Sequence, residues 1–154
     1  MPTGGAQLAF GNLYNLERGT TSYFDGMVLE YSVNGGAFTD ITSGGNAFLT
    51  GGYTGTISAS FGSAIASRSA WSGLSGGTTA APTYINSVIN LPAAAAGQMV
   101  RLKWRVATDS SVSATGLAGA RIDNVTLTAL SAYCGIPRAL DVDLNGSYAG
   151  ATDA

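Results

Sequence analysis

The chain contains no histidine and only one cysteine, Cys134. Without an imidazole there is no base for Ser-His-Asp or Cys-His catalysis, and zinc sites built from Cys and His are excluded as well. A disulfide scaffold within the chain is also excluded, because a single cysteine has no partner. Cys134 itself pairs outside this sequence or with a second copy, or it is a buried, inert thiol.

Charged residues are scarce, at 10% of 154 residues, against about 25% in typical soluble domains. The formal net charge is −2 and no basic cluster is present, which argues against a nucleic-acid partner. No apolar run approaches the ~20 residues that a membrane span needs. The alanine-rich segment 91–97 is far too short. We therefore expect no binding to nucleic acid and no membrane insertion.

Glycine is abundant, with 22 residues, and it occurs together with many Ser, Thr, Ala and Asn residues. This composition favours short strands joined by tight turns. The length fits one domain, large enough to bury roughly 68–70% of its unfolded surface. Turn signals recur about every 8–12 residues and no amphipathic helix is evident, so the sequence predicts an all-β sandwich.

Two strands and a hairpin turn are predicted in the first quarter of the chain. Residues 6–16 form the first strand, and Met27–Val33 alternates so that Met27, Leu29, Tyr31 and Val33 share one face. Asn34–Gly36 tolerates the positive φ of a type I′ turn. Residues 37–41 are the natural return strand.

The segment 97–108 is predicted to be a strand with an inward apolar face and an outward basic row. Its inward residues are Val100, Leu102, Trp104 and Val106, and its outward residues are Arg101, Lys103 and Arg105. We interpret the row as a solvated face with cross-strand partners such as Glu30. An anionic glycan is the alternative partner.

The last predicted strand, residues 120–130, breaks its own alternation. Ile122 is out of phase with Val125 and Leu127, and one extra residue at Asp123–Asn124 restores the phase. We therefore predict a β-bulge there, a feature that often lies next to functional sites. Residues 63–83, by contrast, are predicted to form a long loop.

An ordered set of segments covers residues 6–130: LAFGNLYNLE, YFDGMVLEYSVNGG, GGYTGT, SRSAWSG, NLPAAAAGQMVRLKWRVATDSSV and ARIDNVTL. The set resembles bacterial extracellular jelly-roll modules of the MAM-like and carbohydrate-binding-module-like kinds, which are appended to secreted peptidases and occur in large surface proteins. The resemblance implies a two-sheet antiparallel jelly-roll sandwich, non-catalytic and often calcium-stabilised. One departure is Ala120, where an aromatic residue is expected.

The final segment, LDVDLNGSYAGATDA, resembles the opening of a cadherin-like repeat of large bacterial adhesins. It carries Asp141, Asp143, Asn145 and Gly146 in the D-x-D-x-N-G spacing of a calcium loop. The twelfth loop position is Thr152, however, where an EF-hand requires an acidic residue. We interpret residues 131–154 as a linker and a truncated repeat, an extended tail that is disordered or docked. Residues 1–5 are expected to be disordered or an artificial start.

Five residues are candidate ligands for structural calcium, which the resemblance implies: Glu17, Asp25, Asp109, Asp123 and Asn124. Calcium takes six to eight oxygen ligands and suits sites on loops, and the first loop and the last strand of a jelly roll can come close in space. Alternatively, Asp25 shapes an Asx-turn, Asp109 caps a loop and Asp123 pairs with an arginine.

Three aromatic residues in or near predicted loops are candidate ligand-binding groups: Trp71, Tyr53 and Tyr23. Their ring faces can stack on sugar rings, and Trp71 is the one we most expect to be exposed. Packing at the edge of the core is the alternative.

We therefore expect a non-catalytic extracellular binding or adhesion module of a large bacterial secreted or surface protein, with calcium as a structural cofactor. A glycan or a cell-surface protein is the expected ligand, beside contacts with neighbouring domains of the same long chain. The alternatives are a structural spacer, a module that self-associates through its tail, or an accessory domain of a secreted peptidase. No pair of carboxylates stands out as a hydrolytic site, so no enzyme activity is expected.

Overall fold

The computed structural model describes residues 1–110 and 119–130. Cys134 and the D-x-D-x-N-G motif at 141–146 lie outside the described residues. The described part is all-β, as predicted, apart from two short 3-10 turns. In this part of the chain no helix has the length and apolar character needed to cross a membrane.

Eleven strands are described. They are β1 (Ala6–Asn15), β2 (Gly26–Val33), β3 (Thr39–Asp40), β4 (Phe48–Thr50), β5 (Gly55–Thr56), β6 (Ser69–Ala70), β7 (Gly77–Thr78), β8 (Ala81–Pro82), β9 (Ile85–Asn90), β10 (Val100–Ala107) and β11 (Gly119–Ala129). The 3-10 turns are η1 (Ser43–Gly45) and η2 (Ala93–Ala95). The segment 63–83, predicted to be one long loop, therefore holds the short strands β6, β7 and β8.

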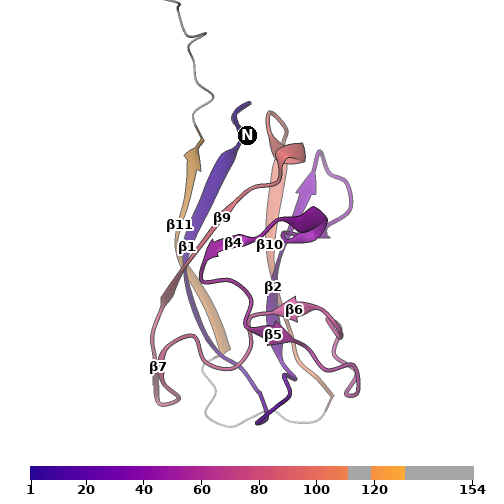
Figure 1. Ribbon diagram of the computed structural model, residues 1–154, viewed down its shortest axis with the longest axis vertical. Coiled ribbons are helices and arrows are strands. Elements are labelled where there is room, and N and C mark those ends of the chain that lie inside the picture. The colour runs from indigo at the N-terminus through magenta and orange to yellow at the C-terminus, as the bar shows by residue number, and fades with distance from the viewer. Residues whose placement is uncertain (111–118, 131–154) are drawn as a thin grey trace, which may run out of the picture.

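Two antiparallel sheets carry the fold (Figure 1). The first has the strand order β11-β1-β9-β4 and the second the order β10-β2-β3. Two-stranded ribbons, β5-β6 and β7-β8, connect the longer strands. Since β1 and β2 are each central in their sheet, the long first loop between them joins the two sheets at one end.

The core lies between the sheets and contains most of the residues predicted to face inward. Val106 of β10 is the exception: it was predicted to face inward, but it is 48% exposed. Leu8 and Phe10 of β1 and Met27 and Leu29 of β2 are all buried in one cluster. The Phe10 ring meets the Trp104 ring edge-on, with the two centroids 5.2 Å apart. Edge-to-face geometry of this kind adds about 0.5–1.5 kcal/mol to the gain from buried area.

The other face of β2 is covered as well, which simple alternation does not predict. Val28 is fully buried against Ile57 and Ile65, from the segment that contains β5 and β6. The contact is close because Gly26 has no side chain: a Cβ there would lie 2.7 Å from Ile57 Cδ1. The start of β2 is thereby fixed in place beside the site described below.

Both sequence signals for backbone irregularity are confirmed. Asn34 and Gly35 have φ values of 51° and 80°, as a type I′ turn requires. In β11, Thr126 pairs with Ala9 but Asp123 pairs with Gly11, so β11 carries one extra residue. The bulge places Asn124 at φ 51°.

The predicted partner of the basic row is confirmed, and a second cation joins it. Lys103 lies opposite Glu30 in the β2–β10 pair, with 2.7 Å between Nζ and Oε2. Arg68 contacts Glu30 and Asp40, both at 2.7 Å. Arg68 comes from the segment that covers β2, so strand alternation alone could not reveal it.

Residues 1–5 were expected to be disordered or an artificial start, and two of them, Met1 and Pro2, are hydrogen-bonded to the turn before β10. The terminal ammonium of Met1 donates to the carbonyl oxygen of Gln98 at 2.8 Å. Gly97 N–H donates to the Pro2 carbonyl at 3.0 Å. These contacts fix the N-terminus near the start of β10.

Candidate metal centre

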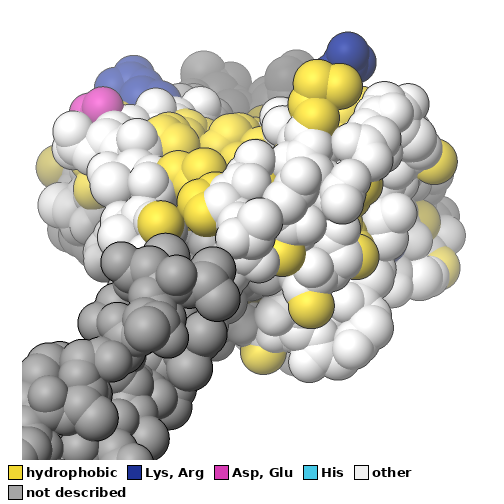
Figure 2. All heavy atoms as spheres, turned by 90° about the horizontal axis from the view of Figure 1, so that it is seen from above, with side chains coloured by type: hydrophobic (Ala, Val, Ile, Leu, Met, Phe, Trp, Pro, Cys, Tyr) yellow, Lys and Arg dark blue, Asp and Glu magenta, His cyan; other side chains and the backbone are white. Residues whose placement is uncertain are grey.

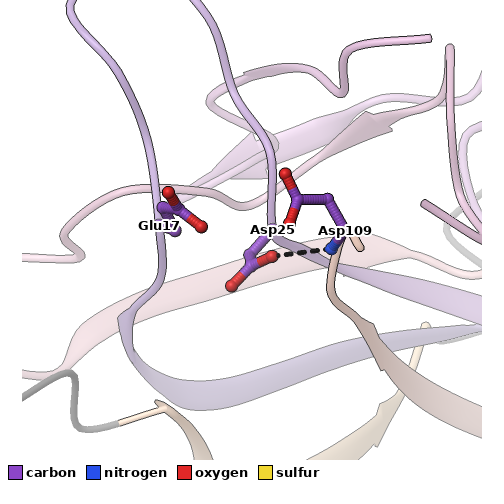
Figure 3. Close-up of side chains that lie close together, drawn as sticks. All are labelled: Glu17, Asp25 and Asp109. Carbon is purple, nitrogen blue, oxygen red and sulfur yellow. Dashed lines mark hydrogen bonds between the residues drawn. The ribbon is translucent and has the colours of Figure 1, made fainter. Parts of the chain in front are cut away.

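Three carboxylates meet at the end of the sheets where the first loop joins β2: those of Glu17, Asp25 and Asp109. One ligand oxygen from each lies within 4.8 Å of the others. Figure 3 shows the three side chains grouped together, each from a different stretch of backbone. These are three of the five ligands predicted from the sequence.

Local hydrogen bonds explain why these three residues converge. The N–H of Asp25 donates to the Glu17 carbonyl at 3.2 Å, which closes the neck of the loop 17–25. Ala107 pairs with Gly26, so Asp109 emerges from β10 beside the start of β2. Its N–H donates to Oδ1 of Asp25 at 3.0 Å (Figure 3). Strand register therefore creates the cluster.

Burial and mutual repulsion act on these carboxylates together. Asp25 is only 6% exposed, and Oε2 of Glu17 is buried without a hydrogen-bond partner among the described residues. Burial raises the pKa of Glu17, and the charges of Asp109 and Asp25 raise it further. The pKa of Asp25 is also raised, chiefly by burial, although the hydrogen bond from the Asp109 N–H opposes this. Both groups favour a proton or another cation nearby.

The two remaining predicted ligands lie elsewhere. Asp123 and Asn124 are at the bulge of β11, where Asp123 pairs with Gly11 in the middle of β1. Oδ1 of Asp123 accepts the N–H of Asn124 at 2.7 Å. The acidic group at the loop end does not include Asp123, because β11 crosses β1 far from the neck of the first loop.

The expected exposure of Trp71 is wrong. This side chain is 0% exposed, and its Nε1–H donates to the Gly51 carbonyl at 2.8 Å. The ring packs edge-on against Phe10, Phe48 and Tyr53. A fully buried ring has no face for stacking on a sugar, so the structure removes the strongest sequence candidate for ligand binding.

Tyr53 and Tyr23 also pack inward, which agrees with the alternative interpretation that these rings pack at the edge of the core. The Tyr53 hydroxyl donates to the Leu29 carbonyl at 3.2 Å and accepts the Leu29 N–H at 3.0 Å. Burial, with the nearby Asp40 charge, raises the Tyr53 pKa. Tyr23 is half-buried against the cluster that contains Val28. These rings fix the loops rather than present flat open platforms.

A cavity of about 360 Å³ borders the carboxylate cluster and shares Glu17 with it. The end of β1 and the first loop contribute Asn15 and Arg18, and the segment before β7 contributes Gly73 and Leu74. The Asn15 side chain donates to the Thr79 carbonyl at 3.1 Å, which ties the two sides together. Sequence reasoning missed this cavity, because its two sides are about 60 residues apart and no motif links them.

The raised pKa values predict a distinctive pH dependence for the metal-free protein. Glu17 and Asp25 bind protons more readily when folded than when unfolded, where their pKa values are ordinary at 4.5 and 3.8. Lowering the pH from 7 toward 5 should therefore increase the free energy of unfolding. The chain has no histidine to titrate in this interval. We expect the Tm in chelator to rise between pH 7 and pH 5.

Glu30 provides the opposing effect at lower pH. Burial alone would raise its pKa, but the hydrogen bonds from Lys103 and Arg68 lower it below 4.5. The stability that Glu30 contributes is thus lost only below that value. Melting curves at pH 7, 6 and 5, with and without calcium, check this prediction. A Tm in chelator that falls steadily from pH 7 would contradict it.

Comparison of the chain with protein-family models, with curated proteins and with solved structures finds no match.

Proposed function

We propose that this chain is a non-catalytic extracellular module of the jelly-roll sandwich type, stabilised by calcium and acting in binding or adhesion. The observation that carries the proposal is the convergence of Glu17, Asp25 and Asp109 at one loop end. Three carboxylates that are partly removed from water repel one another unless a cation joins them. The cluster thus costs stability without a metal and contributes stability with one.

Calcium is the cation that we propose for this cluster. Two oxygens that share one calcium ion at 2.3–2.6 Å can lie up to about 5 Å apart, and the three carboxylates offer oxygens within 4.8 Å of one another. Zinc prefers nitrogen and sulfur ligands in protein sites, and an all-oxygen set on loop ends is typical of calcium.

A calcium ion here would tie three separate segments together. It would link the segment after β1, the start of β2 and the exit from β10, and so add to the hydrogen bonds from the Asp25 N–H to the Glu17 carbonyl and from the Asp109 N–H to Asp25 Oδ1. Glu17 also borders the 360 Å³ cavity, so the same ion would hold one wall of that cavity. The cavity is our candidate for the ligand site, with a glycan or a cell-surface protein group as its occupant.

Isothermal titration calorimetry of the full chain with calcium tests the proposal directly. We expect one class of site for the wild type and at least ten-fold weaker binding for Glu17→Gln, because the variant keeps the shape of the side chain but loses a charged ligand. Asp123→Asn is the matched control and should bind as the wild type does. Equal affinity in all three proteins would rule out this centre.

A structural spacer is the second candidate, and the inward packing of Trp71 and Tyr53 favours it. The three aromatic candidates predicted from the sequence are thus buried or half-buried and offer no open platform for sugars. Calcium-dependent binding on a glycan array, lost on Glu17→Gln, would favour the binding module. A secreted or surface location in a bacterium is part of both proposals, and so is attachment to a larger chain.

A further inference from the structure

The C-terminal half of β11 is exposed on both of its faces, from Asp123 to Ala129. Val125 and Leu127 are 52% and 50% exposed, although Leu127 pairs with the buried Leu8 and so belongs to the face that lines the core. β11 ends at the top of the molecule in Figure 1, and the view onto this end shows hydrophobic side chains gathered near its middle (Figure 2). Exposed apolar patches of this kind mark contact surfaces.

The free edge of β11 has backbone groups in position to accept another strand. β11 pairs with β1 and with no other described strand. Leu130 N–H donates to the Gly5 carbonyl at 3.1 Å, so the backbone of Leu130 faces β1. Because the backbone groups of successive residues in an antiparallel strand point alternately to opposite sides, those of Val125, Leu127 and Ala129 face the free edge. Such an edge can take up an added strand.

Charge distinguishes the β11 edge from the β10 edge. β10 pairs only with β2 among the described strands and carries Arg101, Lys103 and Arg105, so a second copy of β10 beside it would bring two rows of like charge together. Residues 124–130 contain no charged residue, no proline and no glycine. Edge strands usually carry charges or proline that prevent pairing with another chain. The β11 edge therefore permits pairing with an identical edge, whereas the β10 edge opposes it.

One register makes β11 complementary to a second copy of itself. An antiparallel pair centred on Thr126 sets Val125 of each copy opposite Leu127 of the other. Both residues lie on the core-lining face and direct their backbone groups to the shared edge, so they can exchange hydrogen bonds. Thr126 pairs with Ala9 and lies on the outer face, where it meets its own copy as a Thr–Thr pair. Centring the pair on Val125 would instead set Leu127 opposite the charged Asp123.

We infer that two copies of the chain pair antiparallel through β11, about a two-fold axis at Thr126, and join their first sheets into one continuous sheet. The bulge at Asp123–Asn124 limits the contact at one end, because a bulge bends the strand. A contact that uses the same surface on both copies closes after two, so the expected product is a dimer and not a fibre. No residue of this contact belongs to the carboxylate cluster, so the inference is independent of the calcium proposal.

Sedimentation velocity of the full-length chain over a range of concentrations tests this inference. We expect the wild type to change from monomer to dimer as its concentration rises. Thr126→Lys should weaken dimerisation at least ten-fold, because it sets two like charges opposite each other at the axis. The Thr126 side chain is exposed, so the variant should keep its fold, which its melting curve checks. Thr56→Lys, at an exposed position of β5, is the matched control and should dimerise as the wild type does.

An equal mixture of two complementary variants identifies the axis. Thr126→Asp alone should dimerise as poorly as Thr126→Lys, but the mixture should dimerise, because opposite charges then meet across the axis. A wild type that stays monomeric at every accessible concentration would overturn the inference. A dimer that Thr126→Lys does not weaken, or a mixture that stays monomeric, would assign the contact to another surface and overturn it as well.

Hydrogen–deuterium exchange of the wild type gives a test that needs no variant. The amides of Val125 and Leu127 should exchange at least ten-fold more slowly at concentrations where the chain is dimeric than where it is monomeric. Amides of β2 serve as the internal reference, since their exchange should not depend on concentration in this way. Equal exchange of Val125 and Leu127 at both concentrations contradicts pairing with a second copy, whether that exchange is fast or slow.

Discussion

Replacing Trp71 by alanine is expected to lower the free energy of unfolding by about 3–5 kcal/mol, the range for removing a large buried aromatic side chain. The ring is 0% exposed and contacts three other aromatic rings, with centroids 4.8–5.9 Å away. Natural domains have only about 5–15 kcal/mol of stability. For a chain of this length the loss corresponds to a Tm decrease of roughly 6–20 °C, measurable by circular dichroism or calorimetry.

Two further variants make this result specific. Trp71→Phe keeps most of the apolar contact and removes the Nε1–H donor. The Gly51 carbonyl still accepts the Ser87 hydroxyl at 2.7 Å, so this variant should lose much less stability than Trp71→Ala. Tyr84→Ala removes a ring that is 46% exposed and should cost less than about 1 kcal/mol. A Trp71→Ala protein with the same Tm as the wild type would contradict the described core.

The aromatic residues show where prediction from sequence fails. Trp71 follows a Ser-rich and Gly-rich stretch, whose composition is typical of an exposed loop. In the structure its backbone instead exchanges hydrogen bonds with Met27, both at 2.9 Å. This pairing joins residues 44 positions apart, and no local pattern encodes it. The Ser-rich and Gly-rich stretch before Trp71 allows the chain to place this large ring over the core.

The strands and irregularities that local chemistry controls were predictable. The alternation in Met27–Val33 identified β2, and Asn34–Gly36 identified its turn, because both signals depend on neighbouring residues. The extra residue in β11 was also predictable, because Ile122 is out of phase with Val125 and Leu127 in the alternation of apolar residues. Three metal candidates converge because each flanks a strand end, whereas Asp123 flanks a bulge in mid-strand. Which strand ends share one end of a sandwich depends on topology.

Calcium is expected to raise the Tm of the wild type and to reverse the effect of Glu17→Gln. At a concentration 100-fold above Kd, a ligand specific for the folded state adds about 2.7 kcal/mol, or roughly 5–11 °C for a chain of this length. Glu17→Gln should lose most of this gain. In chelator the same variant should be more stable than the wild type, because it removes one of three mutually repelling carboxylates.

The opposite effects of Glu17→Gln on the Tm in calcium and in chelator distinguish a metal centre from a merely structural cluster. If Glu17 only supported the loop, Glu17→Gln would change the Tm in one direction under both conditions. Asp123→Asn removes an equal charge outside the cluster, so it controls for the general effect of net charge. Melts of the three proteins in calcium and in chelator give all the comparisons needed. The metal proposal fails if the wild-type Tm is the same in both, because three converging carboxylates that bind calcium must respond to its removal.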